Sequence, residues 1–162
     1  MINRHILELP AYNAGLPIAR FRSLYGHAPR AKLDSNETPF GVSPRALTAG
    51  QAAVAQAHLY PDGNGTGLRD ALAEATGVEA GCIVLGNGSE ELIYALYGAV
   101  LGMGDHVLTV APGFGLHTLA AQGLRIPVET VRYRADWTLP MAELKAALAR
   151  KPKVFAISSP SN

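Results

Sequence analysis

Cys82-Ile-Val-Leu-Gly-Asn-Gly-Ser-Glu-Glu91 is the stretch of this 162-residue chain that best indicates its fold. The apolar run Cys82–Leu85 predicts a short buried strand, and Gly86 and Gly88 allow the sharp turn that follows. A helix is expected over 89–101. Free N–H groups and the helix dipole favour an anion at the start of such a helix. The same residues also fit a glycine-rich turn, capped by Ser89, that binds nothing.

The turn lacks two well-known phosphate-binding patterns. No Lys-Ser/Thr pair follows the glycines, so it is not a Walker loop. Glu91 stands where a G-x-G-x-x-G motif has its third glycine. The turn therefore predicts an anion site without assigning a nucleotide to it.

Strands and helices alternate after this stretch. Three strands are expected at His106–Val110, Ile126–Arg132 and Val154–Ser158, with helices at Leu116–Gln122 and Met141–Arg150 between them. Alternation of this kind is typical of βαβ units. We therefore predict an α/β fold with a mostly parallel sheet and helices on both faces.

The first part of the chain has a different pattern. Proline and glycine interrupt residues 1–42, which predicts an extended arm whose apolar side chains pack on a partner subunit. Residues 43–162 then form the α/β domain. It begins with a helix from Pro44 to Ala57, capped by Ser43, and a second helix that Thr66 caps and Gly77 ends. Since strand 154–158 would end at the edge where such sheets bind ligands, we expect the domain to be incomplete.

Composition excludes several classes of protein. Fourteen Lys and Arg balance 13 Asp and Glu, which removes the basic footprint of a nucleic-acid binder. The single cysteine, Cys82, excludes an internal disulfide framework and a cysteine-built zinc site, and we predict no metal site. No segment approaches the ~20 apolar residues of a membrane span, and charges interrupt the apolar stretch that a signal peptide would need. The cytoplasm is the expected location.

Two further segments could carry chemistry. Ala111-Pro-Gly-Phe-Gly-Leu-His117 follows a predicted strand, so Phe114 could stack on a flat ring and His117 could lie behind it. Taken alone, a core aromatic and a solvated histidine explain these two residues better. Asn162 ends the chain after the last predicted strand, at the same expected edge of the sheet.

Five segments in the same order carry a resemblance to a known family. They resemble motifs of the class I/II aminotransferases, which are pyridoxal-phosphate enzymes with the aspartate-aminotransferase fold. Within that family they are most similar to the histidinol-phosphate aminotransferases. The segments are Asn36-Glu-Thr-Pro-Phe-Gly-Val-Ser-Pro44, Tyr60-Pro-Asp62, Gly86-Asn-Gly-Ser-Glu-Glu91, Pro112-Gly-Phe-Gly-Leu-His117 and Ser159-Pro-Ser-Asn162.

The resemblance implies a set of cofactor contacts. The backbone of Gly88, Ser89 and Glu90 would receive the phosphate of pyridoxal phosphate, although the family usually has Asp in place of Glu90. Phe114 would stack on the pyridine ring, where relatives more often have Tyr or Trp. Asn162 would form a hydrogen bond with the ring hydroxyl.

Four other residues receive roles from the same resemblance. His117 would lie behind the cofactor ring, near the carboxylate that pairs with the pyridinium nitrogen. Tyr60 would reach across a homodimer interface to the phosphate bound by the neighbouring subunit. Tyr12 and Asn36 would lie near the substrate pocket, although a packed arm and a turn asparagine account for them equally well.

The implied reaction is transfer of an amino group from histidinol phosphate to 2-oxoglutarate, in histidine biosynthesis. In the family the catalytic lysine, the carboxylate-binding arginine and other key residues come later in the chain. We therefore expect no catalytic residue in this segment, including its lysines. Two alternatives stay open: another pyridoxal-phosphate enzyme of the same fold, such as an aromatic aminotransferase, decarboxylase or lyase, or a non-catalytic module that binds a phosphorylated ligand. The lysines are Lys32, Lys145, Lys151 and Lys153.

Overall fold

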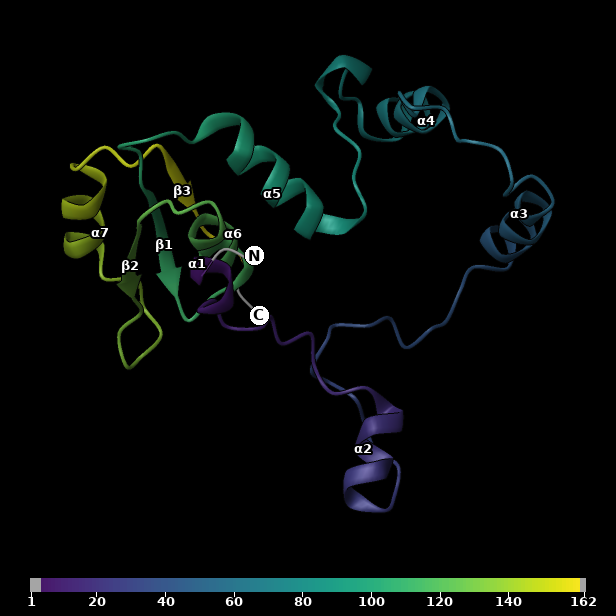
Figure 1. Cartoon of the computed structure of the whole chain (residues 1–162), viewed down its shortest axis with the longest axis horizontal. Coiled ribbons are helices and arrows are strands. Elements are labelled where there is room, and N and C mark those ends of the chain that lie inside the picture. The colour runs from purple at the N-terminus through teal and green to yellow at the C-terminus, as the bar shows by residue number, and fades with distance from the viewer. Residues whose placement is uncertain (1–3, 161–162) are drawn as a thin grey trace. The chain divides into compact units, whose positions relative to one another are not determined.

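The computed structural model describes residues 4–160 and forms two compact units. One unit combines Met1–Tyr12 with Val84–Asn162, and the other is Asn13–Ile83. Figure 1 follows the chain through both. The predicted boundary between an arm of 1–42 and a domain of 43–162 stays a prediction.

A parallel three-stranded sheet forms the centre of the first unit. Strand β1 (Val107–Ala111) lies between β2 (Val128–Arg132) and β3 (Val154–Ala156), in the order β2-β1-β3. Val107 is in register with both Val128 and Val154. Both partners run parallel to β1, so the predicted parallel α/β fold is confirmed.

Helices cover both faces of this sheet, because successive residues of β1 point in opposite directions. Val107 is buried on one face beneath α5 (Gly88–Val100) and α6 (Leu116–Gly123). Leu108 is buried on the other face against α7 (Met141–Leu148). Figure 1 shows α7 on the opposite side of the strands from α5 and α6.

The N-terminal segment of this unit packs beside α6. Helix α1 spans Arg4–Leu7, and Nε2 of His5 lies 2.5 Å from the carbonyl oxygen of Gln122. An added Cβ on Gly123 would lie 4.0 Å from a methyl carbon of Leu9. Residues 4–12 therefore contact the same helix that covers β1.

The strand predicted at Cys82–Leu85 is wrong. Residues Ala80–Cys82 form a 3₁₀ turn, η1, and no β-ladder includes residues 83–85 among the described parts of the chain. Ile83 itself has extended backbone angles. An apolar run supplies strand propensity, but a strand also needs a neighbour that accepts and donates its backbone hydrogen bonds.

The second unit consists of three helices joined by long loops: α2 (Ile18–Tyr25), α3 (Pro44–Val54) and α4 (Thr66–Thr76). None of its residues, 13–83, is fully buried. Helix α2 contradicts the predicted extended arm. Pro17 and Gly26 do not interrupt this helix, because they lie at its two ends, with Gly26 in the left-handed conformation at φ 74°.

Two helix starts differ in detail from the prediction. Ser43 occupies the N-cap position of α3, but its side chain makes no capping hydrogen bond. Thr66 is the first residue of α4 instead of its cap. The Asp62 carboxylate accepts hydrogen bonds from the backbone N–H groups of Asn64 and Thr66, at 3.0 and 2.7 Å. Asp62 therefore stabilises the loop before α4, and these bonds lower the pKa of its carboxyl group.

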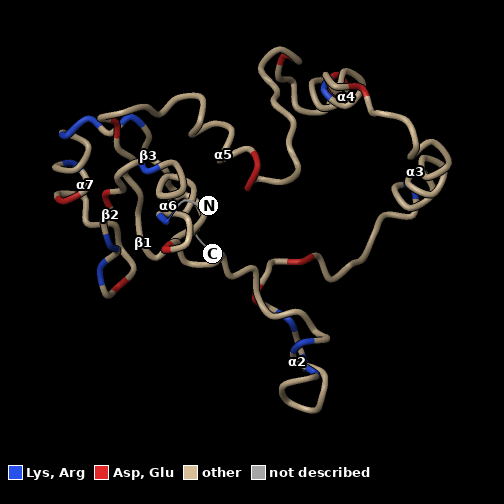
Figure 2. The backbone as a smooth tube through the Cα atoms, viewed as in Figure 1, with Lys and Arg blue, Asp and Glu red and all other residues tan. Residues whose placement is uncertain are grey.

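Charged residues of both signs occur in both units (Figure 2). In the first unit, Arg150 pairs with Glu129, and Arg134 lies 3.9 Å from Glu143. Apart from the half-buried Glu129, these side chains are more than half exposed, and exposed ion pairs contribute little to stability. The apolar contacts on the two faces of β1 therefore dominate the stability of this unit.

Replacing Leu108 by Ala tests this conclusion. The Leu108 side chain is fully buried between β1 and α7, so the cavity should lower the free energy of unfolding by about 2–5 kcal/mol. Leu148→Ala is the matched control, because Leu148 ends α7 but is 40% exposed, and should cost about 1 kcal/mol or less. Denaturant unfolding of the two variants measures both. Equal losses would contradict a core centred on β1.

Candidate functional site

In the first turn of α5, the backbone N–H groups of Ser89 and Glu90 have no hydrogen-bond partner among residues 4–160. The N–H groups before them are occupied. Asn87 donates to the Glu91 carboxylate, and Gly88 donates to the carbonyl of Gly86 at 2.9 Å. The N–H groups of Ser89 and Glu90, which the sequence predicts as donors to an anion, are therefore not used within the described residues.

Gly88 gives this turn its shape. Its φ of 81° lies in the left-handed region, which favours glycine, and an added Cβ would meet nothing within 4 Å. The N-cap residue is Asn87, with no capping bond from its side chain, so the cap at Ser89 that belonged to the alternative without a ligand is wrong. Ser89 and Glu90 lie inside the first turn of α5, where the expected anion site needs them.

A second group of residues follows β1. The loop passes through Pro112 and Gly113 to Phe114, and α6 begins two residues later. An added Cβ on Gly113 would lie 2.6 Å from the carbonyl oxygen of Val110, so only glycine fits this close approach. The backbone thereby sets where Phe114 leaves the edge of the sheet.

Three aromatic rings meet at this loop. Phe114 lies edge-to-face with Tyr12, at 6.5 Å between centroids and 87° between planes. It makes a similar contact with His117, at 5.8 Å and 85°. Phe114 remains 37% exposed. The structure therefore brings together Tyr12, Phe114 and His117, and part of the Phe114 side chain stays open to a ligand.

Tyr97 also belongs to this group, although no motif of the sequence pointed to it. Its ring on α5 stacks with that of His117 at 6.2 Å and 29°, and its hydroxyl oxygen lies 3.1 Å from Nδ1 of His117. Burial raises the pKa of Tyr97 and lowers the pKa of His117. Helical spacing from Ile93 predicts a core position for residue 97, but no local pattern links it to residue 117.

Three other predicted site residues remain. Tyr60 and Asn36 belong to the unit Asn13–Ile83, with Tyr60 fully exposed and Asn36 at a φ of 52°. Asn162 lies outside the described residues. The predicted roles of all three stay predictions.

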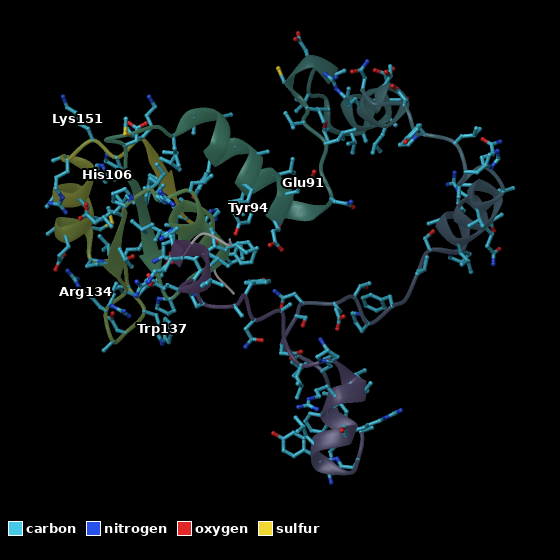
Figure 3. All side chains as sticks on the ribbon, in the orientation of Figure 1. Glu91, Tyr94, His106, Arg134, Trp137 and Lys151 are labelled. Atoms are coloured by element: carbon cyan, nitrogen blue, oxygen red, sulfur yellow. The ribbon has the colours of Figure 1, made fainter. Side chains whose placement is uncertain are left out.

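Three of the four lysines occupy places without the features of a nucleophile. Lys32 pairs with Glu37 and Asp34, at 2.8 and 3.0 Å. The hydrogen bond to Glu37, with that to Asp34, raises the pKa of Lys32, which favours its charged and unreactive form. Lys151 and Lys153 precede β3, at the amino ends of the strands, where Figure 3 labels Lys151 and His106.

Two other kinds of site are absent from the described part of the chain. No cluster of three or more His, Cys, Asp or Glu side chains within residues 4–160 could hold a metal ion. Within the same residues, no helix is both long and apolar enough to cross a membrane.

Together the features define a parallel α/β protein with a helix N-terminus open to an anion and a partly exposed aromatic ring after the central strand. Comparison with known families gives the class a name. The model of the family "Aminotransferase class I and II" matches residues 29–162. The chain belongs to this aminotransferase family.

Two relatives of the chain are histidinol-phosphate aminotransferases. Histidinol-phosphate aminotransferase 1 of Mesorhizobium japonicum is 38% identical over 162 residues, which are all of this chain and 44% of that protein. Histidinol-phosphate aminotransferase of Akkermansia muciniphila is 36% identical over 99% of this chain and 45% of its own length. The chain therefore spans less than half the length of these relatives.

A solved structure confirms the fold. The crystal structure of histidinol-phosphate aminotransferase from Sinorhizobium meliloti, in complex with pyridoxal-5'-phosphate, superposes with a TM-score of 0.77 at 25% identity. The match covers 93% of this chain and 39% of that one. The predicted aspartate-aminotransferase-like fold is thus confirmed for the part of the domain present here.

Gly113→Ala tests the loop geometry. The new methyl group would clash with the Val110 carbonyl oxygen, so the loop must shift, at a cost of about 1–3 kcal/mol of unfolding free energy. The near-UV circular dichroism of the packed aromatic rings should weaken with it. Gly115→Ala is the control: it has helical angles (φ −60°, ψ −20°) and open space around the added Cβ, and should cost about 0.5 kcal/mol or less. Two indistinguishable variants would contradict the assigned role of Gly113.

Proposed function

We propose that the full-length protein is a pyridoxal-phosphate-dependent aminotransferase that transfers an amino group from histidinol phosphate to 2-oxoglutarate, in histidine biosynthesis. The observation that carries the proposal is the pair of N–H groups of Ser89 and Glu90 in a turn of the family type. The histidinol-phosphate aminotransferases among the relatives support the substrate. The relative from Sinorhizobium meliloti, crystallised in complex with pyridoxal-5'-phosphate, supports the cofactor.

The residues present fit the cofactor phosphate. Ser89 and Glu90 offer two N–H donors at the positive end of the α5 dipole, which is the usual way that proteins bind phosphate at a helix start. Gly88 has no side chain and leaves open space beside them. The carboxylate of Glu91 accepts a bond from Asn87, so it already has a partner within the turn.

The residues present also fit a flat ring. Phe114 keeps more than a third of its surface exposed, while edge contacts with Tyr12 and His117 hold its orientation. A ring held by its neighbours loses little conformational entropy when a ligand stacks on it. Tyr12 and His117 thus support the position of Phe114, and Tyr12 is the candidate substrate-side contact.

Pyridoxal phosphate, when bound, acts as an electron sink that allows an amino group to leave one carbon and later join another. The part played by this chain is binding and orientation. Ser89 and Glu90 would hold the phosphate, Phe114 would set the plane of the ring, and Asn162 would donate to the ring hydroxyl. We propose no catalytic residue within this segment.

We further propose a cytoplasmic homodimer with shared sites. Tyr60 supports the dimer, because its side chain is fully exposed and lies in a polar loop that holds Asp62, Asn64 and several glycines. A large aromatic side chain with no packing partner in its own unit is a common feature of protein interfaces. In the proposed dimer its hydroxyl reaches the phosphate bound by the neighbouring subunit.

Phe114→Ala in the full-length protein tests the cofactor site. Loss of the stacked ring should weaken pyridoxal-phosphate binding by roughly 1–3 kcal/mol, which is about 5- to 150-fold in Kd. Phe114→Tyr keeps the ring face and should bind within about threefold of the parent. Titration followed by the visible absorbance of the cofactor gives both constants.

The same titration separates the alternatives. Tight binding that is unchanged by Phe114→Ala would assign Phe114 to the core. Binding of a phosphorylated ligand without any binding of pyridoxal phosphate would favour the non-catalytic module. Decarboxylation or elimination in place of amino transfer to 2-oxoglutarate would favour a different enzyme of the same fold.

Subunit mixing tests the dimer. A Tyr60→Phe subunit mixed with a subunit that lacks the catalytic lysine should regain part of the activity, because one of the two sites in the hybrid would be complete. About a quarter of parental turnover is the upper expectation, since half of the randomly mixed dimers are hybrids with one intact site each. Hybrid dimers without any recovered activity would place Tyr60 in the site of its own subunit, whereas full activity of the Tyr60→Phe homodimer would place it in none.

A further inference from the structure

The hydroxyl group of Tyr97 lies within an apolar cluster and has no role in the proposed function. Tyr97 is 1% exposed and packs with Val107, Ala120 and Ala121. A buried hydroxyl needs a hydrogen-bond partner, since leaving it unpaired is destabilising. The partner of this hydroxyl therefore decides how the cluster is organised.

The partner is His117. The Tyr97 oxygen lies 3.1 Å from Nδ1, and the two rings are stacked with their planes 29° apart. Within residues 4–160 the Tyr97 hydroxyl makes no other hydrogen bond. One contact must therefore satisfy it.

The direction of this hydrogen bond follows from counting protons. A phenol carries one proton on its oxygen, and a neutral imidazole carries one proton on either nitrogen. If Nδ1 were the donor, the Tyr97 proton would have no acceptor among residues 4–160. If Tyr97 donates to Nδ1, the buried phenol proton is satisfied, and the imidazole proton lies on Nε2 of His117, which is only half-buried.

Burial supports the same protonation states. It raises the pKa of Tyr97, so the phenol keeps its proton, and it lowers the pKa of His117, so the imidazole is neutral at neutral pH. Both shifts favour a neutral phenol that donates to a neutral imidazole.

We propose that Tyr97 is a positioning residue that holds His117 as the neutral tautomer with its proton on Nε2. Nε2 makes no hydrogen bond within residues 4–160, so its N–H is free to donate to a carboxylate or carbonyl oxygen. His117 also contacts the ring of Phe114 edge-on. The functional consequence, which rests on the proposed function, is that Tyr97 orients the histidine that supports the cofactor-stacking ring.

Nitrogen NMR of the full-length protein tests the tautomer directly. In cofactor-free protein labelled with ¹⁵N-histidine, two-bond ¹H–¹⁵N correlations distinguish the two neutral tautomers, and His117→Gln identifies the signals of residue 117. We expect the Nε2–H pattern in the parent protein at neutral pH. Tyr97→Phe keeps the ring but removes the donor, so the pattern should change to a mixture of both tautomers.

Tyr94→Phe is the matched control. Tyr94, labelled in Figure 3, also belongs to α5 and packs against the same cluster, but its hydroxyl makes no hydrogen bond within residues 4–160. This variant should leave the His117 pattern unchanged. In the cofactor titration, Tyr97→Phe should raise Kd for pyridoxal phosphate about fivefold, the usual effect of one neutral hydrogen bond, while Tyr94→Phe should not.

The outcomes separate this inference from the proposed function. A parent protein with the Nδ1–H tautomer, or a pattern that Tyr97→Phe leaves unchanged, would overturn the inference. If Tyr97→Phe fails to fold, the tautomer of the parent protein still decides. Cofactor binding with the wrong tautomer refutes the inference alone, whereas the expected tautomer in a protein that binds no pyridoxal phosphate refutes the proposed function alone.

Discussion

Burial of β1 on both faces is the constraint on which the first unit depends. Val107 and Leu108 are adjacent in sequence, yet each is fully buried against a different layer of helices. A strand in this position needs a parallel neighbour on each side and a helix on each face. Strands β2 and β3 provide the neighbours, and α5, α6 and α7 provide the cover.

The candidate site is a consequence of this arrangement. Neighbouring strands and helices fix the position of β1, so the loop that follows its carboxyl end starts from a fixed point. At Gly113 the backbone of this loop passes close to the carbonyl oxygen of Val110. Phe114 and His117 follow within four residues, on the way into α6. Parallel α/β sheets bind ligands at this edge for the same reason: rigid strands end there and the loops between elements are free to vary.

Helix α5 contributes to the site in two ways. Its first turn offers the N–H groups of Ser89 and Glu90, and a residue two turns later, Tyr97, reaches His117 through the core. The same packing that buries Tyr97 against β1 therefore links the helix that carries the candidate anion site to the aromatic group. In the proposed enzyme, phosphate and ring contacts are held by one packed body.

Local signals in the chain were enough to predict the α/β class, the strands β1 to β3 and most helix positions. They also identified the candidate residues Ser89, Glu90 and Phe114. Periodicity, glycines and helix starts can all be recognised within a few consecutive residues. The errors were local too: Pro17 and Gly26 were interpreted as interruptions although they are the ends of a helix. The folded arrangement was needed to see that 82–85 is not a strand and that Tyr97 pairs with His117. Both depend on a partner distant in sequence, and no local pattern specifies which backbone or side chain that partner is.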